Sequence, residues 1–183
     1  MRTVSLNGML TSLSTNFNRR NKNVRLYELG NIYLPKQVPV TELPEERMQF
    51  TLGMYGEGDF FTMKGVIEEF LYKAGMKLKP EYDPEAEKPF LHPGRQANVV
   101  YDGTVIGYLG EVHPTVAANY AIKERVYVAV LDMPEIVSRA SFDHKYEGIA
   151  KFPLQPETFP WLFRRKCLPV ILRRFLMKKA ASS

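Results

Sequence analysis

The three histidines are the first candidates for chemistry, because imidazole binds metals and acts as a general acid or base near neutral pH. They are His92, His113 and His144, and they lie 21 and 31 residues apart. Neither interval matches the spacing of a metal-binding motif. His92 and His113 each precede a proline, which biases the residue before it away from helix. The sequence therefore predicts turn residues at these two positions and no metal site.

The sequence evidence for other catalytic motifs is as weak as that for a histidine site. Cys167 is the only cysteine, and no candidate base stands beside it in the sequence, so it does not resemble an activated nucleophile. Gly53, Gly56 and Gly58 lack both the lysine of a P-loop and the order of a dinucleotide-binding motif. Aspartates and glutamates are scattered, as solvated charges usually are. These patterns favour a binding or structural role over a catalytic one.

The composition predicts a globular cytoplasmic protein. The chain has 183 residues, of which 45% are hydrophobic, so it can bury a core as one domain or one domain and a piece. No apolar run approaches the roughly 20 residues of a membrane helix. The N-terminus has no secretory signal pattern, and one cysteine cannot form an internal disulfide.

The basic charge is concentrated in the last 30 residues. The formal net charge is +5, but residues 154–183 hold seven basic side chains against one glutamate. The rest of the chain is close to neutral. We therefore treat residues 154–183 as an atypical basic tail, separate from a body at residues 1–153.

The hairpin is the clearest structural pattern. Two β-prone runs, residues 96–101 and 104–109, flank Asp102-Gly103, a pair typical of a type I′ turn. Asp59 can cap the helix that follows it. The hydrophobic spacing predicts the other elements as follows: helices at 4–17, 60–74, 115–122 and 134–140, and strands at 24–34, 47–55, 78–82 and 125–131.

These elements alternate irregularly, without the strict strand and helix repeat of a parallel sheet. The fold class expected from the order is α+β, with an antiparallel sheet and helices on one side of it.

Four stretches of the chain carry a family resemblance. In order, they are RTVSLNGMLTSLSTNFNRRNKNVRLYELGNIYL, DFFTMKGVIEEFL, HPGRQANVVYDGTVIGYLGEVHPTV and KYEGIAKFP. Together they resemble the beta subunit of bacterial phenylalanyl-tRNA synthetase, from Arg2 to about Pro153, and specifically its C-terminal catalytic-like core. The resemblance implies a class II aminoacyl-tRNA synthetase-like antiparallel sheet flanked by helices. It also implies truncation at the N-terminal side that removes the first class motif, and loss of the strand in this motif would leave an unpaired sheet edge.

The resemblance further implies part of a phenylalanine-tRNA ligase, which attaches phenylalanine to its tRNA using ATP and magnesium. Working cores clamp ATP with arginines. Here Glu28 stands near where an arginine would be needed, and residues 126–137 contain none. We therefore expect no cofactor in this chain and no activity from it alone. Its expected role is structural, with the catalytic alpha subunit and tRNA as partners and no membrane.

The resemblance narrows the candidate site residues without assigning any catalytic one. Candidates for a structural or interface role are Arg25, Glu28, His92, Gly94, Arg95 and His113. Arg95 is the best of these, because a guanidinium at the start of a strand can hold a carboxylate or carbonyl groups. Candidates for contact with tRNA are Arg19, Arg20 and Lys22, although a polar loop at a helix end explains them equally well.

Residues 154–183 depart from the resemblance. A shifted reading frame from Leu154 allows a family-like continuation, so we hypothesise an out-of-frame remnant of the anticodon-binding domain, which the gene sequence would test. The alternative is a native basic tail that touches RNA or a membrane. In that case the whole chain would be a free-standing RNA-binding module that uses the synthetase-like core and the tail.

Overall fold

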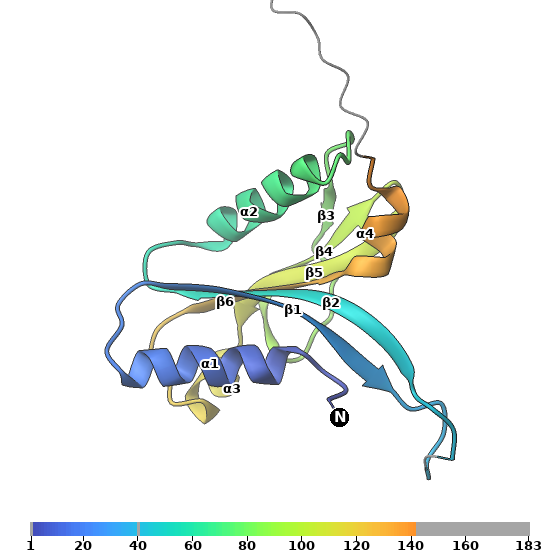
Figure 1. Ribbon diagram of the computed structural model, residues 1–183. Coiled ribbons are helices and arrows are strands. Elements are labelled where there is room, and N and C mark those ends of the chain that lie inside the picture. Colours follow the sequence, from blue (N-terminus) through green and yellow to red (C-terminus); the bar gives the residue numbers. More distant parts are fainter. Residues whose placement is uncertain (1, 40, 142–183) are drawn as a thin grey trace, which may run out of the picture. The chain divides into compact units, whose positions relative to one another are not determined.

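The strands form one six-stranded antiparallel sheet in the order β1-β2-β6-β5-β4-β3 (Figure 1). The structure, a computed structural model, describes residues 2–39 and 41–141. The basic tail at 154–183 and the boundary at residue 153 therefore lie outside the described residues. The strands are β1 (Val24–Leu34), β2 (Glu45–Tyr55), β3 (Glu81–Asp83), β4 (Leu91–Tyr101), β5 (Thr104–Val112) and β6 (Val126–Asp132).

Helices cover both faces of the sheet, so the prediction of helices on one side was wrong. Helices α1 (Leu6–Asn18) and α3 (Pro114–Asn119) lie on one face, and α2 (Phe60–Lys73) and α4 (Met133–Arg139) on the other (Figure 1). The reason is visible in β6, where every residue from Val126 to Leu131 is buried. A strand that is apolar on both sides needs cover on both faces.

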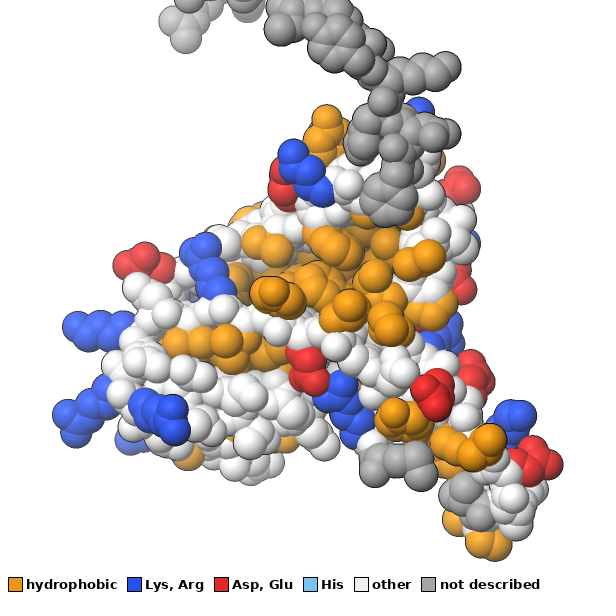
Figure 2. Space-filling view, viewed as in Figure 1, with side chains coloured by type: hydrophobic (Ala, Val, Ile, Leu, Met, Phe, Trp, Pro, Cys, Tyr) orange, Lys and Arg blue, Asp and Glu red, His pale blue; other side chains and the backbone are white. Residues whose placement is uncertain are grey.

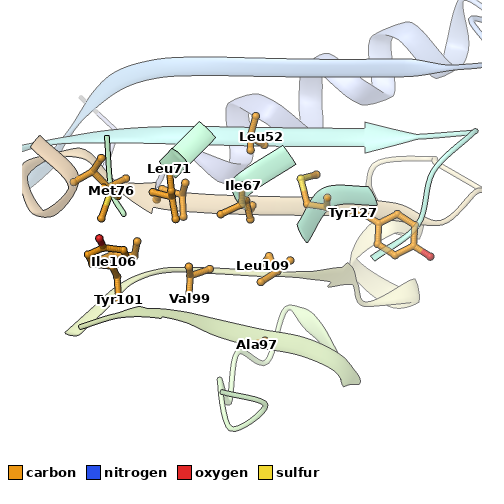
Figure 3. Close-up of a cluster of buried hydrophobic side chains, with 14 of the residues drawn as sticks. Leu52, Ile67, Leu71, Met76, Ala97, Val99, Tyr101, Ile106, Leu109 and Tyr127 are labelled. Carbon is orange, nitrogen blue, oxygen red and sulfur yellow. The ribbon is translucent and has the colours of Figure 1, made fainter. Parts of the chain in front are cut away.

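The core on the α2 face is the larger of two. Ile67 and Leu71 of α2 point toward Leu109 of β5 (Figure 3). Leu131 of β6 belongs to the same cluster, and all four side chains are almost wholly inaccessible. Phe70 of α2 stacks on Phe50 of β2 with ring centroids 4.6 Å apart. This packing holds α2 over the middle of the sheet.

The core on the opposite face depends on a close approach between α1 and β2. Met9, Leu10 and Leu13 of α1 are buried against this face. A Cβ on Gly53 of β2 would lie 2.7 Å from Cγ of Met9 and 2.9 Å from Cδ1 of Leu13. A glycine at this position therefore lets the helix lie directly on the strand.

The hairpin is confirmed, and its strands are longer than predicted. Asp102 and Gly103 have φ values of 50° and 71°, as a type I′ turn requires. β4 and β5 lie inside the sheet, between β6 and β3. Their register shifts twice, between Val99 and Val100 and again between Leu91 and Gln96. The second shift forms the candidate site described below.

The predicted cap at Asp59 is also confirmed. Its carboxylate accepts hydrogen bonds from the backbone N–H of Thr62 and from the Thr62 hydroxyl, both at 2.8 Å. The Thr62 hydroxyl in turn accepts from the backbone N–H of Asp59, which completes a capping box. These hydrogen bonds, first that from the Thr62 backbone, lower the pKa of Asp59 from its ordinary value.

We expect Asp59→Ala to destabilise the protein at pH 7 and to have a smaller effect in acid. Because the folded state lowers the pKa of Asp59, its contribution is present above the ordinary carboxyl pKa of about 4 and is lost as the pH falls through the folded value. Thermal unfolding of both proteins at pH 7 and pH 3 measures the difference. A difference in melting temperature that does not shrink at pH 3 would contradict this role of the carboxylate.

Candidate binding site beside the hairpin

The site begins with a β-bulge at the start of β4. Leu91 pairs with Val112 and Gln96 pairs with Gly110, so the four residues 92–95 lie against a single residue of β5, Glu111. Bulges of this kind re-aim side chains next to functional sites. The bulge contains the His-Pro-Gly-Arg sequence, and it turns Arg95 toward Glu111.

Glu111 is a buried carboxylate held by arginine. Its side chain is 5% exposed, and Nη1 of Arg95 donates to Oε1 at 3.0 Å and to Oε2 at 2.8 Å. Nε of Arg125 lies 4.0 Å from Oε1. Such pairing offsets the cost of burying a charge. Tyr127, which pairs with Glu111 across the sheet, has a raised pKa, mainly because it is buried and secondarily because Glu111 is negative.

A cavity of about 630 Å³ opens beside this ion pair. Its volume is within the range of ligand pockets, and it combines an apolar wall with a few polar groups, as such pockets do. The polar residues are His92, Arg95, Glu111, Lys123, Glu124 and Arg125, and the apolar wall comes from Val112, α3 and the turn after it. The site has charges that can bind a ligand, but the arginine nearest the buried carboxylate is already engaged.

The prediction of turn residues holds for His113-Pro114, between β5 and α3, but His92-Pro93 lies within β4, in its bulge. The backbone N–H of Gly94 donates to Nδ1 of His92 at 3.1 Å. In the same way the N–H of Thr115 donates to Nδ1 of His113 at 3.2 Å, and this imidazole caps α3. Both histidines therefore fix backbone, His92 in the bulge of β4 and His113 at the start of α3.

The remaining candidates from the sequence lie apart from the cavity. Glu28 of β1 is paired with Nη1 of Arg2, whose Nε also donates to the Asn31 carbonyl at 3.0 Å. Arg25 donates to the Glu57 carbonyl at 3.1 Å. Arg19, Arg20 and Lys22 are exposed on the loop between α1 and β1. The structure thus brings together only His92, Gly94 and Arg95 of the predicted set, in the bulge.

Sequence reasoning missed Glu111, Arg125 and Arg2. Glu111 carried a signal, because it is a charged residue within an otherwise apolar strand and thus needed a partner. Arg125 carried none, since a basic residue before a strand is usually solvated. Arg2 reaches Glu28 only because the N-terminal segment runs beside β1, where the N–H of Tyr33 donates to the Arg2 carbonyl at 2.8 Å.

The described part of the chain contains no group of three or more potential metal-binding side chains. Within the same residues, no helix has the length and apolar character needed to cross a membrane.

Sequence comparisons identify similar proteins. The profile of the phenylalanyl tRNA synthetase beta chain CLM domain matches residues 1–133. The phenylalanine-tRNA ligase beta subunit of Clostridium acetobutylicum is 41% identical over 153 residues, which is 84% of this chain and 19% of that protein. The Clostridium tetani subunit is 39% identical over 153 residues, with the same coverage. The Streptococcus thermophilus subunit is 34% identical over 160 residues, covering 81% of this chain and 20% of its own.

The chain therefore spans about a fifth of the length of these relatives. The profile matches the N-terminal 133 residues of this chain and names the CLM domain. It does not support the expected identity as a C-terminal catalytic-like core.

A solved structure shares the fold. The pyrrolysyl-tRNA synthetase from Desulfitobacterium hafniense superposes with a TM-score of 0.59 at 12% sequence identity, covering 75% of this chain and 48% of that one. At this identity the similarity concerns the fold alone. It agrees with an α+β fold, like that of a tRNA synthetase, built on a six-stranded antiparallel sheet.

Proposed function

Because this chain belongs to the phenylalanyl-tRNA synthetase beta chain family, we propose that it is a non-catalytic domain of phenylalanine-tRNA ligase. The ligase would join phenylalanine to its tRNA using ATP and magnesium in the cytoplasm, with the chemistry on a separate alpha subunit. This chain would hold that subunit and help to seat the tRNA.

The main support for a non-catalytic role is that Arg95, at the candidate site, is already bound to a carboxylate. Stabilising the charge that develops on a reacting phosphate requires cations aimed at that phosphate. Arg95 instead gives Nη1 to both oxygens of the buried Glu111 carboxylate. At β1, Glu28 is likewise bound to Arg2. These groups support a fixed structure and offer no preorganised ATP clamp.

An exposed apolar surface on β1 and β2 supports a protein partner. Tyr27 is 75% exposed and Leu29 is 54% exposed. With Met48 they lie on the α2 face of β1 and β2. Tyr27 contacts Phe50, with ring centroids 6.0 Å apart. Figure 2 shows hydrophobic side chains gathered on this side of the molecule. Such patches mark interaction sites, and we assign this one to the alpha subunit.

Copurification with the alpha subunit tests the proposal. We expect the chain to show no phenylalanine-dependent exchange of pyrophosphate with ATP alone, and to copurify with a coexpressed alpha subunit from the same genome. Tyr27→Ser combined with Leu29→Ser should reduce the copurified amount at least tenfold, because exposed aromatic anchors dominate interfaces. Val105→Ser is the matched control, since Val105 is also 54% exposed but lies on β5 beside the hairpin turn. Equal retention of the alpha subunit by both variants would contradict this assignment.

A second candidate function is the free-standing RNA-binding module. The exposed cations Arg19, Arg20 and Lys22 favour it. It differs from the first in one outcome: such a module would bind RNA without ever copurifying with the alpha subunit.

A further inference from the structure

One end of the sheet carries exposed cations from two loops that are about 100 residues apart in the sequence. Arg19, Arg20 and Lys22 lie between α1 and β1, and Lys123 and Arg125 lie between α3 and β6. All five residues are exposed. We call these five residues the basic end. Figure 2 shows Lys and Arg side chains gathered at the left of the molecule, where these loops lie in Figure 1.

The sheet register explains why the two loops meet. Val24 at the start of β1 and Val126 at the start of β6 both pair with Tyr55, from opposite sides of β2. Two strand spacings separate them, which is about 10 Å. On the adjacent face, the Ser14 hydroxyl of α1 donates to the carbonyl of Tyr120 at 2.5 Å and ties α1 to the segment after α3. The two loops are therefore held side by side by the fold.

Few carboxylates oppose these cations. Within the described residues, the side chains of Arg19, Arg20, Lys22 and Lys123 form no ion pair, and Arg125 is 4.0 Å from Glu111. The neighbouring carboxylates that face this end are Glu57, Glu124 and Asp59, the last of which caps α2. At the opposite ends of β1, β2 and β6 the balance reverses, with Glu42, Glu45, Glu46, Asp132 and Glu135 against Lys36, Arg47 and Arg139.

The composition of the two loops favours a nucleic acid over a lipid surface. Binding at a membrane surface takes exposed apolar side chains beside the cations. None of the large exposed hydrophobic residues among those described lies in these two loops. They lie on the segment before α1, on β1, β2, β5, α2 and α4, in the loop at 35–44 and in the segment after α2. The loop between α1 and β1 instead adds Asn21 and Asn23, next to Asn18 at the end of α1, and their amides can donate to phosphate oxygens.

We propose that the basic end binds the phosphate backbone of RNA, with both loops acting as one surface. The inference rests on the proposed function and specifies where this domain would contact tRNA. Arginine guanidinium groups bind phosphate bidentately, and lysines add point charges. Contacts of this kind position RNA and do not read its sequence. Lys123 and Arg125 of this surface also line the cavity described above.

The salt dependence of RNA binding tests this surface. The probe is a phenylalanine tRNA transcribed in vitro, titrated with the full chain between 50 and 200 mM salt. Each phosphate contact contributes roughly 0.7 to 0.9 to the slope of log affinity against log salt. We expect R19Q/R20Q/K22Q to lower the slope by roughly 2, K123Q/R125Q by roughly 1.5, and each to weaken binding about tenfold at 50 mM salt.

The matched control removes three other exposed cations, K73Q/K77Q/K79Q, at and beyond the C-terminal end of α2. It changes the net charge as much as the first variant and should leave the slope within error of the unmodified chain. Residues 154–183 are the same in all variants, so their cations contribute equally. Equal slopes for all variants would overturn the proposal, and so would a fall confined to one of the two loops.

The test separates this inference from the proposed function. Both basic-end variants should still copurify with the alpha subunit, because Tyr27 and Leu29 are unchanged. Unchanged slopes with intact copurification would refute only the RNA surface. Lowered slopes without any copurification would refute only the assignment to the ligase.

Discussion

Replacing Gly107 with alanine should lower the free energy of unfolding by about 3 kcal/mol, whereas the same change at Gly65 should raise it by about 1 kcal/mol. Gly107 lies in β5 opposite Leu131 of β6. A Cβ there would stand 2.3 Å from the Val130 carbonyl oxygen and 2.9 Å from Cα of Leu131. These are backbone atoms of a central strand, and they cannot move without breaking the pairing of β5 with β6.

Gly65 is the matched control because it sits in α2 with no heavy atom within 4 Å of the added Cβ. Alanine there gains helix propensity and costs no packing. Urea unfolding followed by circular dichroism measures both changes. Shifts of the same sign for the two variants would show that β5 and β6 are packed less tightly than the structure indicates.

Loss of the Glu111 carboxylate should also destabilise the protein strongly. We expect Glu111→Gln to cost about 2 kcal/mol, because a hydrogen bond to a charged group contributes about 1.5–3 kcal/mol. The cost should stay below that of a fully buried pair, since the Arg95 side chain is 42% exposed and remains partly hydrated. The amide keeps the shape of the carboxylate but removes the charge that Arg95 binds.

A double-mutant cycle with Arg95→Ala isolates the pair. The coupling energy between Arg95 and Glu111 should be at least about 1 kcal/mol. Glu135 and Arg139, an ion pair one turn apart on α4, provide the control with an expected coupling of about 0.5 kcal/mol. A coupling at Glu111 no larger than at Glu135 would mean that the buried carboxylate does not organise the site.

Periodicity alone predicted most of the elements. The bounds expected for β1 are those observed, and α2 was placed within one residue, since Asp59 marks its start. These signals are local, so a single stretch of sequence contains them. The two-residue turn at Asp102-Gly103 was found for the same reason.

The arrangement of the elements was not predictable in this way. The order of the strands depends on β6 inserting between β2 and β5, which is a contact between distant segments. The site was missed for a related reason. A two-residue turn alone would place Arg95 opposite Gly110, but the bulges shift the register, and residues 92–95 instead lie against Glu111. No local sequence pattern predicts such a shift in register.

The position of β6 between two hairpins has a consequence for synthesis on the ribosome. The hairpin of β1 and β2 can close within about 10 μs of its emergence. The inner edge of β2 then stays unpaired until β6 is synthesised. β6 begins about 70 residues later, and translation of these residues takes roughly 4–14 s. During that interval the nascent chain presents a free β-edge to other nascent chains and to chaperones.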